Sequence, residues 1–344
     1  MSFTLDVDAA RWRAHLAAFH DKTPGLVPVI KGNGYGLTND TLATEAARLG
    51  VSQIAVGTYA EAPAALASFP GDVLVMSPWR PFLTDVVYDA RLVHTLGRVA
   101  DFADLRKVAP AGTRVNAEAL TSMARHGLNR HAFAAAAAEL DGLVLDGLAI
   151  HLPMAGANFA EAENLAAALQ ASRLETMTIY VSHLTDSELA LLRAKRPELD
   201  IRPRIGTALW LGDRGALSVS ASILDRHQVS RGERIGYRQR PMPRDGTLVI
   251  VSGGTAHGIG LEAPSAASGV RQRATSLAKG GLDAAGLALS PFVIGGKQRW
   301  FAEPPHMQAS MLFLPRSVTP PEIGDMITAG VRFTTTHFDA ITLA

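Results

Sequence analysis

The sequence contains no cysteine, which excludes disulfide bonds, thiolate metal sites and thiol catalysis. It has no excess of one charge, because 33 lysines and arginines balance 32 aspartates and glutamates, and a net charge of +1 gives no reason to expect nucleic acid or an anionic membrane as a partner. No apolar run approaches the roughly 18–20 residues of a membrane span. The first residues also lack the basic and then apolar regions of a secretory signal, so we expect a cytoplasmic protein.

The first two-thirds of the chain alternates between short apolar runs rich in β-branched residues and longer stretches rich in alanine and leucine. The short runs predict strands and the longer stretches predict helices. The expected strands are Val27–Lys31, Ile54–Gly57, Asp72–Ser77, Val93–Leu96, Arg114–Ala117, Gly147–His151, Met177–His183 and Ile201–Leu209. Helices are expected between them, such as Asp40–Leu49, Ala60–Ala67, Arg130–Leu140, Asn158–Leu169 and Asp186–Lys195.

Roughly eight such repeats predict an α/β fold with parallel strands joined by crossover helices, and the number favours a closed (β/α)8 barrel over an open doubly wound sheet. In a barrel the chemistry takes place at the C-terminal ends of the strands, where Lys31, His151 and Ser182 would lie.

The pattern changes after about Asp213, where glycine and proline become frequent and long helical stretches end. We therefore divide the chain into a barrel over residues 1–214 and a mainly-β C-terminal domain over residues 215–344. Antiparallel strands are expected at Val229–Tyr237, Gly246–Gly253, Pro291–Gly295 and Ser310–Pro315. Ala263–Ala288, rich in small residues, is expected to form loops with a short helix and is a candidate lid.

The stretch with the clearest chemical content is Val27–Gly36, a buried-strand pattern that ends in Lys31 and continues into a glycine-rich turn. A lysine at the mouth of a buried strand can have its pKa lowered by burial, which makes its amine a nucleophile for Schiff-base chemistry. The same pattern also fits a strand-end lysine that extends to water. The glycine spacing matches neither a phosphate-binding P-loop nor a dinucleotide fingerprint.

Ile30-Lys-Gly-Asn-Gly-Tyr-Gly36 resembles the cofactor-lysine motif of the alanine racemase family, which reads roughly V-K-A-N-A-Y-G. The resemblance implies that Lys31 carries pyridoxal 5'-phosphate at a (β/α)8 barrel followed by a β domain. It also implies that Tyr35 approaches the cofactor phosphate. An amino-acid substrate and a homodimer with shared active sites are implied in the same way.

Further segments resemble the family, and each implies a role for residues of this chain. Asn116–Arg125 resembles K-V-D-T-G-M-x-R, so Arg125 would meet the substrate carboxylate, and Glu118 would hold Arg125 in place of a carbamylated lysine. His151 would stack on the cofactor ring. Ser182 would bind the phosphate, with its neighbour His183 held in reserve.

Arg202–Trp210 resembles R-x-G-I-x-L-Y of the family. Arg204 would then face the pyridine nitrogen, and Gly206 and Thr207 would donate to the phosphate. Arg202 is the competing register. His306–Ser310 weakly resembles V-S-M-D-Q, which implies that Met307 meets the substrate carboxylate.

The resemblance fails at the second catalytic base. Ile250–Gly258 resembles V-P-I-G-Y-A-D-G, but Thr255 stands where the family has its catalytic tyrosine, and His257 replaces the aspartate. Threonine is a poor proton carrier, whereas histidine titrates near neutral pH. Either His257 acts as the opposite-face base, or only one face has a proton carrier.

Three functions follow from these residues. The first is an amino-acid racemase that uses a Lys31 aldimine, with His257 or Thr255 on the opposite face. The second is a pyridoxal-phosphate enzyme of one-face chemistry, such as a decarboxylase or an aldolase-type enzyme, and the third is a non-catalytic cofactor-binding protein. No metal is expected, because the sequence has no His-x-x-x-His motif or carboxylate cluster of metal-binding spacing.

Overall fold

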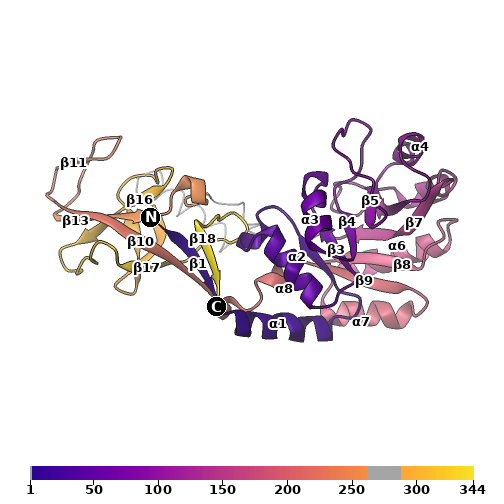
Figure 1. Ribbon diagram of the computed structural model, residues 1–344, viewed down its shortest axis with the longest axis horizontal. Helices are drawn as coiled ribbons and strands as arrows, with labels where there is room; N and C mark the ends of the chain where they lie inside the picture. The colour runs from indigo at the N-terminus through magenta and orange to yellow at the C-terminus, as the bar shows by residue number, and fades with distance from the viewer. Residues whose placement is uncertain (1, 262–287) are drawn as a thin grey trace. The chain divides into compact units, whose positions relative to one another are not determined.

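The computed structural model describes residues 2–261 and 288–344 and consists of two compact units (Figure 1). One unit spans residues 14–212, and the other combines residues 213–344 with the N-terminal residues up to Arg13. Among the described residues, no helix is both long enough and apolar enough to cross a membrane.

The unit of residues 14–212 is a closed barrel of eight parallel strands, which confirms the expected (β/α)8 fold. Its strands, in order around the barrel, are β2 (Val27–Ile30), β3 (Gln53–Val56), β4 (Asp72–Val75), β5 (Leu92–Leu96), β6 (Thr113–Ala119), β7 (Leu143–His151), β8 (Thr178–Ser182) and β9 (Asp200–Ile205). The helices are α1 (Ala9–Lys22), which begins in the other unit, α2 (Asn39–Arg48), α3 (Ala62–Ser68), α4 (Val99–Val108), α5 (Phe133–Ala137), α6 (Asn158–Gln170), α7 (Asp186–Lys195) and α8 (Thr207–Trp210).

Alternate residues of the barrel strands pack into one interior core. This core consists of Val27, Val29, Ala55, Leu74, Val93, Ala149 and Tyr180. Because side chains alternate along a strand, residues two positions further on from a core residue face the same interior. The apolar content and the β-branched residues of these strands suit them to burial on both faces, as a parallel barrel requires.

The last predicted barrel strand is shorter than expected. It was expected over Ile201–Leu209, but β9 ends at Ile205, and Gly206 leads into α8. The Trp210 amide donates to the Gly206 carbonyl at 3.0 Å, which begins the helical turn. The Trp210 indole nitrogen donates to the Val29 carbonyl at 2.8 Å, and this hydrogen bond attaches the turn to β2.

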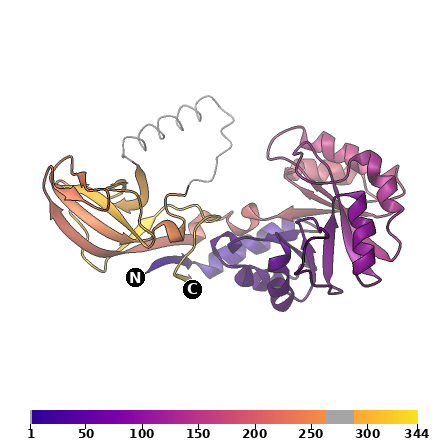
Figure 2. The same cartoon turned by 90° about the horizontal axis from the view of Figure 1, so that it is seen from above.

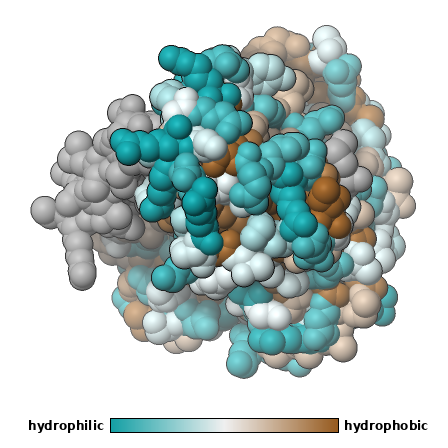
Figure 3. Space-filling view, turned by 90° about the vertical axis from the view of Figure 1, so that its left-hand side faces the viewer, coloured by the Kyte–Doolittle hydropathy of each residue, from teal (hydrophilic) through white to brown (hydrophobic). Residues whose placement is uncertain are grey.

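The other unit is built on an eight-stranded sheet with the order β13-β16-β15-β14-β17-β10-β1-β18. Figure 2 shows the strands of this unit in a second view. Its strands are β1 (Phe3–Val7), β10 (Leu217–Val229), β13 (Gly246–Ser252), β14 (Leu289–Ile294), β15 (Lys297–Phe301), β16 (Ala309–Pro315), β17 (Met326–Ala329) and β18 (Ala340–Leu343). A separate two-stranded hairpin pairs β11 (Arg234–Ile235) with β12 (Arg240–Pro241). On the face seen in Figure 3, hydrophobic residues form separate small patches between hydrophilic side chains.

The N-terminal segment belongs to this sheet, although the sequence-based division assigned it to the barrel. β1 pairs antiparallel with β10 and parallel with β18. Phe3 and Leu5 are fully buried there. A strand near the N-terminus thus pairs with two strands that lie more than 200 residues further along the chain, a pairing that no local pattern specifies.

Two further expectations for this unit differ from the structure or fall outside it. The strand expected at Val229–Tyr237 is divided, because β10 ends at Val229 and a turn leads into the short β11. The stretch Ala263–Ala288, named as a candidate lid, lies outside the described residues except for Ala288.

Candidate active site

Lys31 follows directly after β2, whose four residues are all buried. Its backbone turn is fixed by one carboxylate: Glu61 accepts from the backbone amide of Gly32 at 2.7 Å and from that of Gly57 at 2.6 Å. A Cβ on Gly57 would lie 3.0 Å from the Lys31 Cβ and 2.9 Å from a Glu61 carboxylate oxygen, so a side chain at this position would displace the Glu61 carboxylate and press on Lys31. Glu61 was not among the predicted site residues, since its role depends on contacts between two loops.

The electrostatic surroundings of Lys31 favour its neutral amine. Burial lowers the pKa of Lys31, and the positive charges of Arg125 and Arg204 lower it further, while Glu61 acts in the opposite direction. A lysine with a lowered pKa has more unprotonated amine at neutral pH and is a better nucleophile and base.

Four candidate residues on other strands face the same interior near the C-terminal ends of those strands. Glu118 pairs in register with the core residue Ala149, and Arg204 pairs with the core residue Val27. His151 and Ser182, which pair with each other, each follow a core residue by two positions. Lys31 likewise follows the core residue Val29 by two positions. The register therefore brings together Lys31, Glu118, His151, Ser182 and Arg204.

Arg202 and Arg204 both face the barrel interior, but at different depths. Arg202 is bound near the N-terminal ends of the strands, where it donates to Gln53 Oε1 at 2.9 Å and to Ser52 Oγ at 2.8 Å and lies over the Tyr180 ring. Arg204 lies one pleat nearer the C-terminal ends and is buried. Its Nε and Nη2 atoms are buried without a hydrogen-bond partner in the described part of the chain. Such donors are costly to leave unpaired and fit an acceptor supplied by a ligand.

Arg204 shares a charged group with Glu118 and Arg125. Arg125 Nη2 lies 3.8 Å from Glu118 Oε1, and only 4% of the Glu118 side chain is exposed. Burial raises the pKa of Glu118, whereas the positive charges of Arg204, Arg125 and Arg80 act to lower it. The Glu118 Oε2 atom has no partner among the described residues. Arg80, which also pairs with Asp101 at 2.7 Å, is a member of this group that the sequence did not indicate.

His151 and Ser182 form a hydrogen-bonded pair, with 2.9 Å between His151 Nδ1 and Ser182 Oγ. Burial lowers the pKa of His151 to about 3, assisted by the positive charges of Arg204 and Arg125. His151 is therefore a neutral ring at physiological pH. His183 packs edge-on against it, with 5.4 Å between the ring centroids, and has a positive φ of 58°.

Tyr35 and Gly206 come from opposite ends of the barrel sequence and meet in space. Tyr35 is buried and has a positive φ of 55°. A Cβ on Gly206 would lie 2.0 Å from the Tyr35 hydroxyl oxygen. Burial raises the pKa of Tyr35 to about 12, so the phenol stays protonated and can donate a hydrogen bond. Thr207, the next residue, is exposed beside this contact.

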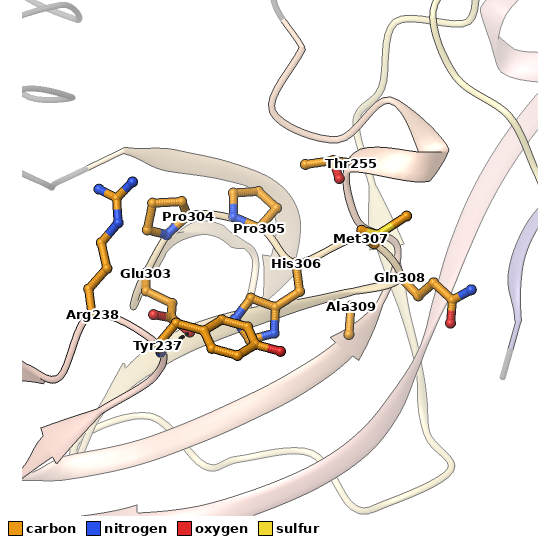
Figure 4. A pocket seen from close by; sticks show the side chains of 10 residues that line it. All are labelled: Tyr237, Arg238, Thr255, Glu303, Pro304, Pro305, His306, Met307, Gln308 and Ala309. Atoms are coloured by element: carbon orange, nitrogen blue, oxygen red, sulfur yellow. Dashed lines mark hydrogen bonds and ion pairs between the residues drawn. The ribbon is translucent and has the colours of Figure 1, made fainter.

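The candidate residues of the other unit have different surroundings. His257 is held at both ring nitrogens: Nδ1 accepts from the Gly254 amide at 3.2 Å, and Nε2 lies 3.0 Å from Asp339 Oδ1. Its ring also packs against Phe3 at 5.5 Å between centroids. Thr255 and Met307 are exposed and line a pocket of about 720 Å³, together with Tyr237, Arg238, Glu303, Pro304, Pro305, His306, Gln308 and Ala309 (Figure 4).

No metal centre accompanies these groups: within residues 2–261 and 288–344, no three or more histidine, cysteine, aspartate or glutamate side chains are placed to hold a metal ion.

These observations define a class of barrel protein with a lysine-centred site and an additional antiparallel β unit. The family model described as "Alanine racemase, N-terminal domain" matches residues 7–213, and the chain belongs to this family. A search of curated protein sequences finds no match.

Solved structures show the same fold. Alanine racemase from Bartonella henselae with covalently bound pyridoxal phosphate aligns with a TM-score of 0.71 at 16% identity, covering 96% of this chain and 91% of that chain. Alanine racemase from E. faecalis aligns with a TM-score of 0.69 at 18% identity, covering 95% of this chain and 88% of that one. Histidine racemase from Leuconostoc mesenteroides subsp. sake aligns with a TM-score of 0.66 at 14% identity over 95% and 87% of the two chains.

Proposed function

We propose that this protein is an amino-acid racemase that interconverts L- and D-amino acids and uses Lys31 as the covalent attachment point of its cofactor. Family membership makes the chain a pyridoxal-phosphate enzyme. The reaction and the roles of individual residues are the proposal. The observation that carries it is the placement of a lysine of lowered pKa beside the buried Arg204, whose Nε and Nη2 are unpartnered.

The residues present fit the cofactor. Arg204 has two buried donors that need an acceptor, as the nitrogen of a pyridine ring would provide. Tyr35 offers a phenol donor at Gly206, and Thr207 offers an exposed hydroxyl beside it, which suits a phosphate. His151, a neutral ring, supplies a flat surface for a heterocycle.

When bound, the cofactor withdraws electrons from the substrate's α-carbon and makes its hydrogen acidic. Lys31 Nζ takes or returns that proton on one face of the α-carbon. Arg125 binds the substrate carboxylate, and the buried carboxylate of Glu118 positions Arg125 through their ion pair. We assign the second unit and Met307 to the substrate side of the site in a homodimer whose subunits share active sites.

A second function is one-face chemistry at the same lysine, such as decarboxylation or aldol-type cleavage. The observation in its favour is that both ring nitrogens of His257 are engaged, by Gly254 and Asp339. The hydroxyl of Thr255 does not titrate in the neutral range. If no other proton carrier serves the opposite face, racemisation cannot be the reaction.

The test is to incubate the cofactor-loaded protein with single L- and D-amino acids in deuterated water. Proton NMR follows the loss of the α-hydrogen, and chiral chromatography follows the products. Exchange with formation of the opposite enantiomer supports the racemase and identifies its substrate. Exchange with retained configuration, or a new product, supports one-face chemistry. The Lys31→Ala protein is the control and should show neither exchange nor covalently held cofactor after borohydride reduction and mass spectrometry.

A further inference from the structure

The pocket of the second unit contains a histidine that is oriented by a buried carboxylate. The side chains of His306 and Glu303 lie next to each other in this pocket (Figure 4). His306 Nε2 lies 2.5 Å from Glu303 Oε1, and only 2% of the Glu303 side chain is exposed, against 30% for His306. A buried carboxylate that accepts from one ring nitrogen fixes the tautomer of a histidine and leaves the other nitrogen to carry a proton.

The position of Glu303 is specified by the backbone beside it. A Cβ on Gly236, which has a φ of +67°, would lie 2.0–2.2 Å from the carboxyl group of Glu303. The Tyr237 amide points toward the same oxygen, Oε1, at 3.4 Å. His306 is the only ion-pair partner that Glu303 has in the described part of the chain. The β11–β12 turn and the segment before β16 are thus shaped around this carboxylate–histidine pair.

The side of the pair away from Glu303 is open. His306 Nδ1 has no hydrogen-bond partner within the described residues, whereas both ring nitrogens of His257 are occupied. Tyr237 packs on the His306 ring with 4.6 Å between centroids, yet 86% of the tyrosine is exposed. Met307, which is 72% exposed, lines the same pocket. An exposed aromatic and an exposed methionine around an unpaired ring nitrogen form a surface suited to contact with another molecule.

The pocket also includes Thr255, whose backbone amide donates to the His306 carbonyl at 2.8 Å. Racemisation requires a proton to leave one face of the α-carbon and a proton to arrive on the other, so a fixed lysine on one face needs a second carrier on the opposite face. Among the described residues that line the pocket with Thr255, His306 has an imidazole ring with one free nitrogen.

We propose that His306, oriented by Glu303, is the second proton carrier of the racemase, an inference that rests on the proposed function. In one direction Lys31 Nζ accepts the α-proton, and protonated His306 Nδ1 delivers a proton to the opposite face. In the other direction the roles reverse, so atoms and electrons balance without an oxidant or reductant. Glu303 is a positioning residue.

The test is the variant His306→Gln, whose side-chain amide can still donate to Glu303 and preserve the local fold. We expect racemisation to fall by about 10²–10⁴-fold, the usual contribution of a general acid–base group. Exchange of the α-hydrogen with deuterium should continue for the enantiomer whose proton Lys31 removes, with retention of configuration. Imidazole added to His306→Ala should restore part of the racemisation. His227→Gln, which changes an exposed histidine paired with Asp225 at 3.4 Å, is the matched control and should behave as the wild type.

A second readout does not depend on the loaded enzyme. In cofactor-free protein labelled with ¹⁵N in its histidine side chains, His306 should be observed as the Nε2-protonated tautomer that takes a second proton at Nδ1. Glu303→Gln should mix the tautomers and shift the pH profile of racemisation, whereas a purely structural role would change neither in a folded variant.

Three outcomes would overturn the proposal. One is unchanged racemisation in His306→Gln. Another is a ¹⁵N NMR spectrum in which the neutral His306 ring carries its proton on Nδ1 alone. The third is loss of racemisation in Tyr237→Phe with normal rates in His306→Gln, which would make the phenol the carrier. Failure of the underlying racemase function has a different signature, because wild-type protein would then form no opposite enantiomer from any amino acid.

Discussion

The hydroxyl group of Tyr35 lies directly against the backbone of Gly206, so that a Cβ at position 206 would lie 2.0 Å from the phenolic oxygen. This contact joins the turn that follows Lys31 to the turn that ends the last barrel strand. Two segments separated by most of the barrel sequence are therefore fixed to each other beside the proposed attachment lysine. The contact depends on the absence of a side chain at position 206.

Gly206→Ala should weaken cofactor binding. The added methyl group must displace Tyr35, and overpacking of this kind costs about 1–3 kcal/mol. If that cost is borne by the cofactor-bound form, the dissociation constant rises by about 5- to 150-fold. Absorbance titration of the cofactor-free protein with pyridoxal phosphate measures the change. Gly330→Ala is the control, because a Cβ there meets only the Pro291 carbonyl oxygen at 4.0 Å. Equal affinities of Gly206→Ala and the wild type would show that the Tyr35 turn does not contribute.

Arg202 and Arg204 should respond differently to replacement by lysine. Arg204→Lys should change the absorbance spectrum of the bound cofactor and lower the racemisation rate, since a lysine offers a point charge in place of a planar guanidinium. Arg202→Lys should lower the free energy of unfolding by about 1–3 kcal/mol through its lost hydrogen bonds to Gln53 and Ser52. Absorbance spectra and urea denaturation of both variants show which of the two arginines contacts the cofactor. A spectral change in Arg202→Lys alone would reverse it.

Acid should destabilise the barrel through a buried histidine that takes no part in the proposed reaction. Burial lowers the pKa of His94 from its usual 6.5 to about 4, and its Nδ1 lies 3.1 Å from the Tyr59 hydroxyl. The unfolded chain therefore binds a proton below pH 6.5 that the folded chain does not bind until about pH 4. Stability from the neutral ring is fully present above pH 6.5 and is lost as the pH falls through this window.

The size of this effect is about 2–3 kcal/mol between neutral pH and pH 4.5. Urea denaturation of wild type and His94→Gln at both pH values measures it. The difference in unfolding free energy between the two pH values should be smaller in His94→Gln by that amount. His227→Gln, an exposed site, should retain the wild-type difference. The same pH dependence in His94→Gln and the wild type would place the acid sensitivity elsewhere.

If two subunits share each active site, inactive variants should complement each other. Lys31→Ala and His306→Gln chains, each nearly inactive alone, are unfolded together and refolded at equal amounts. Half of the resulting two-fold dimers are mixed, and each mixed dimer has one intact site out of two. The mixture should therefore regain about a quarter of wild-type racemisation. Each variant refolded alone is the control. Absence of recovery despite mixed dimers, shown by native mass spectrometry, would place both residues of a site in one subunit.

The barrel could be predicted because its signals are local. Each strand is a short apolar run, a helix follows each of them except β4, and all eight predicted strands lie within or overlap the observed ones. Lys31 could be placed at a strand end because the glycines after it close the strand. The predicted last strand was too long, since apolar residues of α8 such as Leu209 fit a strand pattern as well as a buried helical turn.

The second unit was less predictable, because its defining contacts are between distant segments. Nothing near Phe3 indicates that it pairs with Ala221, and nothing near Glu303 indicates that Gly236 has to make room for its carboxylate. His257 was chosen as a base because of its place in a motif. Only the structure shows that Gly254 and Asp339 occupy its ring nitrogens and that His306 retains a free one.

The sequence by itself determined the eight barrel strands and the position of Lys31 at the end of a buried strand, because hydrophobic periodicity and glycine turns act within a few residues. The tertiary structure decided which partners each of the two barrel arginines meets. Arg202 and Arg204 share one face of a strand, so their local patterns are equivalent, and they differ only in the neighbouring strands that each one meets. It also decided the Glu303–His306 pair, because hydrogen-bond geometry around a buried carboxylate arises only when β11 and the segment before β16 are folded together.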